Sequence, residues 1–279
     1  GPLGSPRAIL DPRGPPVTTP DLTSALSTLR ARNPLVHNIT NYVVMNTTAN
    51  ALLAVGASPA MVHAGEEVAD FAPIAAALVI NIGTLSVPWV EAMAAAAAAA
   101  NGAGVPWILD PVAAGATAFR GETCRRLVAL KPAVIRGNAS EIMALAGSRS
   151  AGKGVDSTAS SESAADTARR LARDTGAVVA VTGRVDYVTD GERTAAIANG
   201  DVMLTRVTGT GCTATAIISA YLGAGLAPFD AAVAGLATIG VAAYAAVKEA
   251  RGPGSFQVAL IDALYRLDDA ALAGGARIS

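Results

Sequence analysis

The sequence Val207-Thr208-Gly209-Thr210-Gly211-Cys212-Thr213-Ala214-Thr215-Ala216-Ile217-Ile218 places two glycines and a cysteine directly before an apolar run with helical spacing. A glycine-rich turn that opens a helix directs several backbone N–H groups at one point, and the helix dipole adds partial positive charge there. Cys212 falls in the first turn, where a thiolate is favoured. We therefore interpret Gly209, Thr210, Gly211 and Cys212 as an anion-binding turn.

The sequence of this turn also fits two other interpretations. Residues 209–214 also match the dinucleotide pattern G-x-G-x-x-[GA], which opens a βαβ unit with further parallel strands after it. The chain after Cys212 is expected to be helical to its end, so we reject a dinucleotide site. In the second alternative the glycines only allow close packing at a helix start, and the pattern by itself leaves that alternative open.

Outward from this turn, short apolar runs alternate with helical patterns. Strands are expected at 35–38, 60–63, 78–82, 106–109, 134–136 and 177–182, and a hairpin at 187–189 and 194–198. Helices are expected at 21–32, 42–55, 66–76, 86–101, 117–130, 138–146, 160–175, 213–222, 228–250 and 255–271. This order predicts an α/β fold: a mostly parallel central sheet with helices on both faces, in a single domain over residues 21–279.

Composition narrows the classes of function. Of 279 residues, 52% are hydrophobic and 15% charged, with a formal net charge of −1. Neither nucleic acid nor an anionic membrane is expected as a partner. We interpret the apolar stretches at 92–100 and 231–247 as buried helices of a soluble protein. Two cysteines make no disulfide framework, and we assign Cys124 no function. This cysteine usage, together with the lack of a visible signal peptide, predicts a cytoplasmic protein.

Two segments are set aside from the fold. Residues 1–5 resemble a remnant of protease cleavage, and the proline-rich leader up to residue 20 is expected to be disordered. Residues 147–154 nearly spell a P-loop, but Gly154 stands where the Mg²⁺-binding Ser or Thr belongs, and a helix precedes the segment. We expect a surface loop there.

Ligands of such sheets bind outside the carboxyl ends of the strands, so the polar residues at those ends are the candidates for a site. They are Asn38, Asn41, Asp110, Arg136, Asn138 and Thr182.

Each candidate has a local alternative. Asp110 suits Mg²⁺ held through water, or caps a turn before Pro111. Arg136 suits phosphate, with Glu141 near a metal, although Asn138 and Glu141 also resemble a capping box. Thr182 donates to a phosphate or ends a strand. Met61 lines a pocket or belongs to the core, and His37 and His63 receive no role.

Taken in series, the motifs closely resemble hydroxyethylthiazole kinase from about residue 22 to residue 267. They are Pro34-Leu35-Val36-His37-Asn38-Ile39-Thr40-Asn41, Gly56-Ala57-Ser58-Pro59-Ala60-Met61, Asn81-Ile82-Gly83-Thr84-Leu85, Leu109-Asp110-Pro111-Val112, Ile135-Arg136-Gly137-Asn138-Ala139-Ser140-Glu141, Val207-Thr208-Gly209-Thr210-Gly211-Cys212 and Gly252-Pro253-Gly254-Ser255-Phe256.

The resemblance implies a ribokinase-like fold and ATP-dependent phosphorylation of 4-methyl-5-(2-hydroxyethyl)thiazole on the way to thiamine. It also implies a homotrimer with active sites between subunits. Among the residues, it implies that Met61, Asn41 and Gly209 lie at the thiazole, Arg136 and Thr182 at ATP, and Asp110 and Glu141 around Mg²⁺. Residues 209–212 would form the anion hole.

The resemblance leaves the role of Cys212 open. Many ribokinase-like relatives have Asp as the base at this position. A largely dissociative phosphoryl transfer asks little of a base, so we assign Cys212 a positioning or weak-base role. The alternatives are another ribokinase-like enzyme, such as a hydroxymethylpyrimidine kinase or NAD(P)H-hydrate dehydratase, for which Asp would be expected at residue 212, and a binding module without catalysis.

Overall fold

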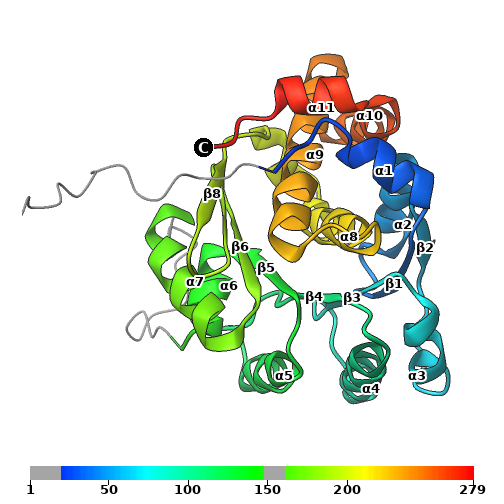
Figure 1. Cartoon of the computed structure of the whole chain (residues 1–279), viewed down its shortest axis with the longest axis vertical. Helices are drawn as coiled ribbons and strands as arrows, with labels where there is room; N and C mark the ends of the chain where they lie inside the picture. The colour runs from blue at the N-terminus through cyan, green and yellow to red at the C-terminus, as the bar shows by residue number, and fades with distance from the viewer. Residues whose placement is uncertain (1–19, 148–160) are drawn as a thin grey trace, which may run out of the picture.

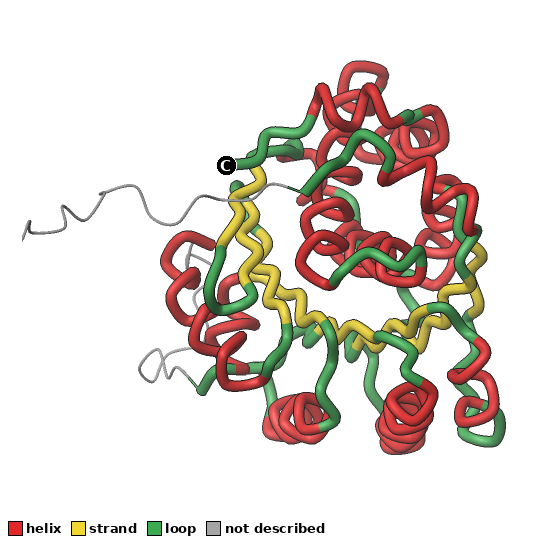
Figure 2. The backbone as a smooth tube through the Cα atoms, viewed as in Figure 1, coloured by secondary structure: helices red, strands yellow, loops and turns green. Residues whose placement is uncertain are grey.

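One sheet of eight strands runs through the molecule, in the order β2-β1-β3-β4-β5-β6-β7-β8. It is seen in a computed structural model that describes residues 20–147 and 161–279. Figures 1 and 2 show the sheet as a curved layer with helices on both sides. The sequence-based prediction of a mostly parallel sheet covered on both faces is therefore confirmed.

The first six strands are parallel, and the last two form the predicted antiparallel hairpin. Their bounds are β1 Leu35–Ile39, β2 Ser58–Ala60, β3 Ala77–Asn81, β4 Trp107–Asp110, β5 Val134–Asn138, β6 Val178–Thr182, β7 Asp186–Thr189 and β8 Thr194–Ile197. The register pairs Asn81 with Asp110 and Asn138 with Thr182, so polar residues from neighbouring strands meet at one edge of the sheet.

Two groups of helices cover the two faces. One face carries α3 Val68–Phe71, η1 Ala72–Ile74, α4 Val87–Ala103, α5 Ala118–Ala129, α6 Ala139–Leu145 and α7 Ser161–Thr175. The other carries α1 Ala25–Arg32, α2 Met45–Val55, α8 Thr210–Gly223, α9 Pro228–Glu249, α10 Pro253–Arg266 and α11 Asp269–Gly275, with η2 Val202–Arg206 before α8.

The molecule has two hydrophobic clusters, one on each face of the sheet, because side chains alternate between the faces along each strand. On β3, Val79 packs into one hydrophobic cluster, while Leu78 and Ile80 pack into the other. On β4, Ile108 and Leu109 divide in the same way. Successive side chains of a strand point to opposite faces, so continuous apolar runs are what a sheet buried on both sides requires.

Several predicted boundaries were wrong. The expected helix at 66–76 is instead the short α3 and η1, because Pro73 removes a backbone donor inside it. The expected helix at 255–271 is two helices, because Asp268 caps α11 by accepting from the Ala271 N–H. The first helix begins at Ala25 rather than at residue 21, and the Asp21 carboxylate instead accepts a hydrogen bond from the Thr23 N–H. Two predicted segments lie outside the described residues: the leader expected to be disordered, except residue 20, and the expected surface loop at 147–154, except residue 147.

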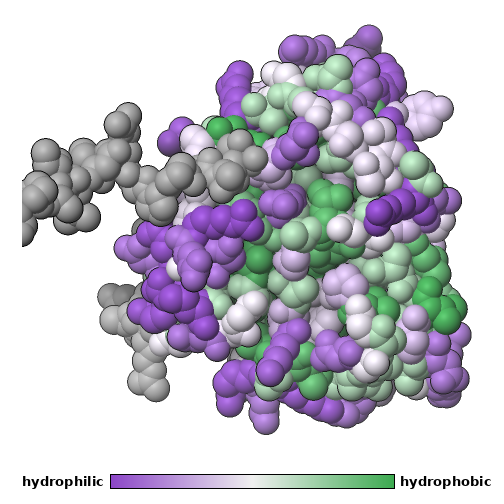
Figure 3. Space-filling model, in the orientation of Figure 1, coloured by the Kyte–Doolittle hydropathy of each residue, from purple (hydrophilic) through white to green (hydrophobic). Residues whose placement is uncertain are grey.

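The helix α9 is long and apolar enough to cross a membrane by length and composition, but 72% of its apolar window is buried. It lies in the core against α8 and α10, as expected for a buried helix. In Figure 3 the side of the molecule that carries α7 is strongly hydrophilic, whereas hydrophobic residues are exposed nearer the middle of the same face.

Candidate functional site

The first turn of α8 has the geometry that anion binding requires. Gly209 precedes the helix with φ of +82°, a left-handed conformation in which glycine is strongly favoured. A Cβ there would lie 2.6 Å from Cγ1 of Val44. The first helical hydrogen bond runs from Thr213 N–H to Gly209 O, so the N–H groups of residues 210–212 have no partner within the helix.

Arg136 brings its guanidinium to this same turn. A Cβ on Gly211 would lie 2.7 Å from Nη1 of Arg136, so a side chain there would displace the guanidinium from this position. Nη2 of Arg136 donates to Oγ1 of Thr182 at 2.7 Å, and Nη1 lies 3.8 Å from Oδ2 of Asp110. The structure therefore places predicted residues from β4, β5, β6 and α8 around one positively charged point.

Asp110 is buried, and only one of its two carboxylate oxygens has hydrogen-bond partners among the described residues. Its Oδ2 accepts from Nδ2 of Asn81 and from Oγ1 of Thr215, each at 2.8 Å. Its Oδ1 is buried without a partner among the described residues. Burial raises the pKa of the carboxyl to about 6, and the charge of Arg136 opposes that shift. A free carboxylate oxygen of this kind fits a hydrated Mg²⁺ ion.

Glu141 performs the local role that the sequence left open. Its Oε2 accepts from the Asn138 N–H at 2.8 Å, and Asn138 Oδ1 accepts from the Glu141 N–H at 2.9 Å, which completes a capping box. Its Oε1 accepts from the Ala113 N–H at 2.9 Å, in the loop after Asp110. Both oxygens thus bind backbone groups, and toward a cation Glu141 offers mainly its charge.

Cys212 is a thiol in this environment. Burial and the charge of Asp110 raise its pKa to about 11, so the thiolate expected from the helix position does not form near neutral pH. The dipole of one helix turn is weaker than the desolvation of a buried thiolate. Nδ2 of Asn41 donates to Sγ of Cys212 at 3.5 Å, which joins the end of β1 to α8.

A cavity of about 390 Å³ opens beside Arg136. It is lined by β6–β7, η2, the start of α8 and the middle of α9, and includes Thr182, Thr210 and Gly211. Asp186 also lines it, and burial raises the pKa of that carboxyl to about 6. This cavity is large enough for part of a nucleotide and lies directly at the anion-binding turn.

Met61 lies on the other side of the turn, after the edge strand β2. Among the described residues no hydrogen bond joins it to the other predicted site residues. An aromatic cluster connects the segment 61–63 to Tyr42, the residue after Asn41. The ring centroids of Tyr42 and His63 lie 4.7 and 4.8 Å, respectively, from that of Trp89.

Comparison with known proteins decides the family. A model of the hydroxyethylthiazole kinase family matches residues 26–270. The chain belongs to the hydroxyethylthiazole kinase family. A hydroxyethylthiazole kinase from Granulibacter bethesdensis is 58% identical over 252 residues, which cover 90% of this chain and 92% of that protein.

Solved structures agree with this membership. A hydroxyethylthiazole kinase structure from Pyrococcus horikoshii OT3 superposes with a TM-score of 0.86 at 46% identity, covering 92% of this chain and 98% of that one. A ribokinase-like superfamily protein from Enterococcus faecalis has a TM-score of 0.61 at 12% identity over 84% of this chain and 88% of that one, which supports the fold alone. The predicted ribokinase-like fold is therefore confirmed.

Three residues of the candidate site were not predicted from the sequence: Asn81, Thr215 and Asp186. Asn81 ends β3 beside Asp110, but in the sequence it lies within the apolar run that predicts a strand at 78–82. Its position at a strand end was the available signal. Thr215 carried no signal, because it faces Asp110 only once α8 packs against the sheet.

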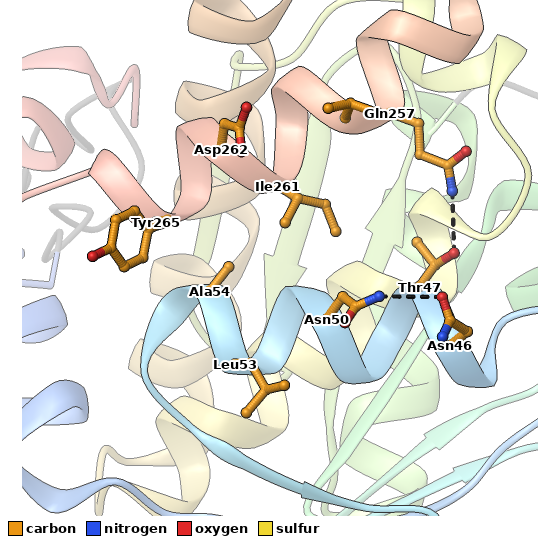
Figure 4. A pocket seen from close by; sticks show the side chains of 10 residues that line it. Asn46, Thr47, Asn50, Leu53, Ala54, Gln257, Ile261, Asp262 and Tyr265 are labelled. Carbon is orange, nitrogen blue, oxygen red and sulfur yellow. Dashed lines mark hydrogen bonds between the residues drawn. The ribbon is translucent and has the colours of Figure 1, made fainter.

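The larger cavity lies elsewhere, in an exposed groove of about 520 Å³ between α2 and α10. Figure 4 shows its polar end, where Asn50 binds Asn46 and Gln257 binds Thr47, each at 3.1 Å. Leu53 and Tyr265 leave large hydrophobic surface exposed there. None of the predicted site residues lines this groove.

Proposed function

We propose that this chain phosphorylates the hydroxyl of 4-methyl-5-(2-hydroxyethyl)thiazole with ATP, giving the thiazole phosphate and ADP in thiamine biosynthesis or salvage. The family membership supports this activity. The observation that carries it is the close approach of the Arg136 guanidinium to Gly211 at the first turn of α8. A fixed cation and free N–H groups at one point are what a transferred phosphoryl group requires.

In this proposal each residue has a defined part. The N–H groups of residues 210–212 and the Arg136 guanidinium bind the phosphoryl oxygens, and Thr182 holds that guanidinium. The nucleotide occupies the cavity beside Arg136, and the alcohol lies on the side of Asn41 and Met61. Cys212 stays neutral and positions the hydroxyl, whose proton is lost late in a dissociative transfer.

Mg²⁺ is proposed as the metal. Oδ1 of Asp110 would hold it through water, and Glu141 would add charge nearby. When bound, the ion neutralises charge on the phosphates of the nucleotide. The chain's own contribution is to keep Oδ1 free, because Asn81 and Thr215 both donate to Oδ2.

A homotrimer with active sites between subunits is also proposed. Tyr42 and Val43 follow Asn41 directly, and they expose 65% and 62% of their surface at the rim of the alcohol side. A second copy would cover them. We further propose that residues 21–279 act as one kinase domain, since every strand in the described part of the chain joins one sheet. We also propose that the enzyme works in the cytoplasm, with neither membrane nor nucleic acid as partner.

A coupled assay of ADP release tests the activity. The thiazole alcohol, ATP and Mg²⁺ should give turnover well above the ATPase background, and the product should be the thiazole phosphate. Hydroxymethylpyrimidine and NAD(P)H hydrate, tested in parallel, should give none. Turnover of either compound without turnover of the thiazole would replace the proposal with another ribokinase-like activity.

A further inference from the structure

Asn81 has an amide whose orientation is settled by two unambiguous partners. Its Nδ2 lies 2.8 Å from Oδ2 of Asp110, and its Oδ1 lies 2.9 Å from the Gly83 N–H. An ionised carboxylate only accepts hydrogen bonds and a backbone N–H only donates. The amide nitrogen of Asn81 must therefore face Asp110, and its oxygen must face Gly83.

That orientation determines the next amide in the row. Oδ1 of Asn81 also accepts from Asn41 at 2.9 Å, so Asn41 must present Nδ2 to it. The same Nδ2 lies 3.5 Å from Sγ of Cys212. Asn41 is 5% exposed, and its Oδ1 accepts no hydrogen bond from the described residues.

Gly83 makes room for this arrangement. A Cβ on Gly83 would lie 2.6 Å from Nδ2 and 2.8 Å from Cγ of Asn41. The amide of Asn41 therefore packs directly on the backbone that donates to Asn81. Both the space and the hydrogen-bond polarity at Asn41 are prepared by the loop that follows β3.

We propose that Asn81 is a positioning residue that turns the amide oxygen of Asn41 toward the substrate, so that the site accepts a hydrogen bond from the alcohol. This inference rests on the proposed function. The hydroxyl is the only hydrogen-bond donor of the thiazole alcohol, because the ring nitrogen and sulfur carry no hydrogen. An acceptor at Asn41 therefore distinguishes the alcohol from the same thiazole without its hydroxyl.

The test measures binding without metal or nucleotide. Calorimetry compares the thiazole alcohol with 5-ethyl-4-methylthiazole, which has the same ring and no hydroxyl. The wild-type enzyme should bind the alcohol about 3- to 10-fold more tightly, the range of one neutral hydrogen bond. In Asn81→Leu this ratio should fall to about 1, while the affinity for the ethyl compound changes little.

Two further variants make the experiment specific. Thr215→Val removes the other donor to Asp110 and leaves Asn81 and Asn41 joined, so it should keep the wild-type ratio. Gly83→Ala displaces the amide of Asn41 with Asn81 intact, so it should lose the ratio and tests the inference even if Asn81→Leu does not fold.

The outcomes separate this inference from the activity. Equal weakening of both ligands in Asn81→Leu would show a merely structural role and overturn the proposal. A wild-type enzyme that turns over the alcohol but binds both ligands equally would overturn it too, and would leave the kinase activity standing. Absence of turnover by the wild-type enzyme would overturn the activity and this inference with it.

Discussion

The two sides of the first turn of α8 are built differently. On the alcohol side, buried amides from the ends of β1 and β3 are joined in a row, from Asn41 through Asn81 to Asp110. On the nucleotide side an open cavity is bordered by charged residues, among them Arg136 and Asp186. In the proposed arrangement the small substrate would therefore meet groups of fixed orientation, whereas the nucleotide would meet an open, charged cavity. The turn itself belongs to both sides.

The substitution Gly209→Ala should have the largest effect, because it displaces the turn that the two sides share. The added Cβ would meet Val44, and the left-handed backbone would be strained. We expect kcat/KM to fall by about 100-fold or more, the range for losing donors to a developing charge. The ADP-release assay measures this loss for both substrates.

Gly104→Ala is a matched control for Gly209→Ala. Gly104 also has a left-handed φ, of +71°, but a Cβ there meets nothing within 4 Å, and the residue lies at the end of α4. It should lose about 1 kcal/mol of unfolding free energy and keep its activity. If Gly209→Ala lost no more activity than this control, the turn would not be the anion site.

Arg136→Lys should separate the two sides. A lysine amine cannot at once reach Thr182, Asp110 and the turn at Gly211, as the planar guanidinium does. We expect kcat/KM for ATP to fall about 30-fold, while binding of the thiazole alcohol to the nucleotide-free enzyme stays within about twofold. Kinetics with varied ATP and calorimetry with the alcohol measure the two effects. Equal losses in both would show that the sides are not independent.

Asp110 lies between the two sides, and its burial should make the free energy of unfolding depend on pH. Its folded pKa of about 6 lies above the ordinary carboxyl pKa of 3.8, so between these two pH values the folded state binds a proton that the unfolded state lacks. This contribution to stability is fully present below the unfolded pKa and is lost as the pH rises through about 6.

The metal-free wild-type protein should therefore gain about 1 kcal/mol of unfolding free energy relative to Asp110→Asn between pH 7 and pH 5. Urea denaturation of both proteins at the two pH values measures the difference. A difference that does not change with pH would mean that Asp110 titrates near its ordinary pKa and is not held in a desolvated position.

On each side of the turn the sequence indicated strand-end residues and missed a neighbour, Asp186 beside Arg136 and Asn81 beside Asn41. Arg136 and Thr182 stood out because polar groups that end apolar strands of a parallel sheet meet at one edge. Asn81 ends a strand as well, but its role depends on the register with Asp110 and on the direction of its amide, which no local pattern encodes. Similarly, the position of Cys212 in the first turn of a helix predicted a thiolate. That prediction is wrong because burial raises the thiol pKa, and burial is a tertiary property that no local pattern encodes.

Cys212→Ser should have the smallest effect of these changes, and it tests whether the alcohol side needs a base. The thiol pKa of about 11 leaves Cys212 neutral near pH 8, so the proposed transfer uses no thiolate. A serine hydroxyl can accept the hydrogen bond from Nδ2 of Asn41 in place of Sγ. We therefore expect kcat/KM to fall only about threefold, with an unchanged pH profile between pH 7 and 9. A loss as large as that of Gly209→Ala would instead make the sulfur part of the chemistry, and the row of amides would then serve to hold a reactive group rather than an alcohol.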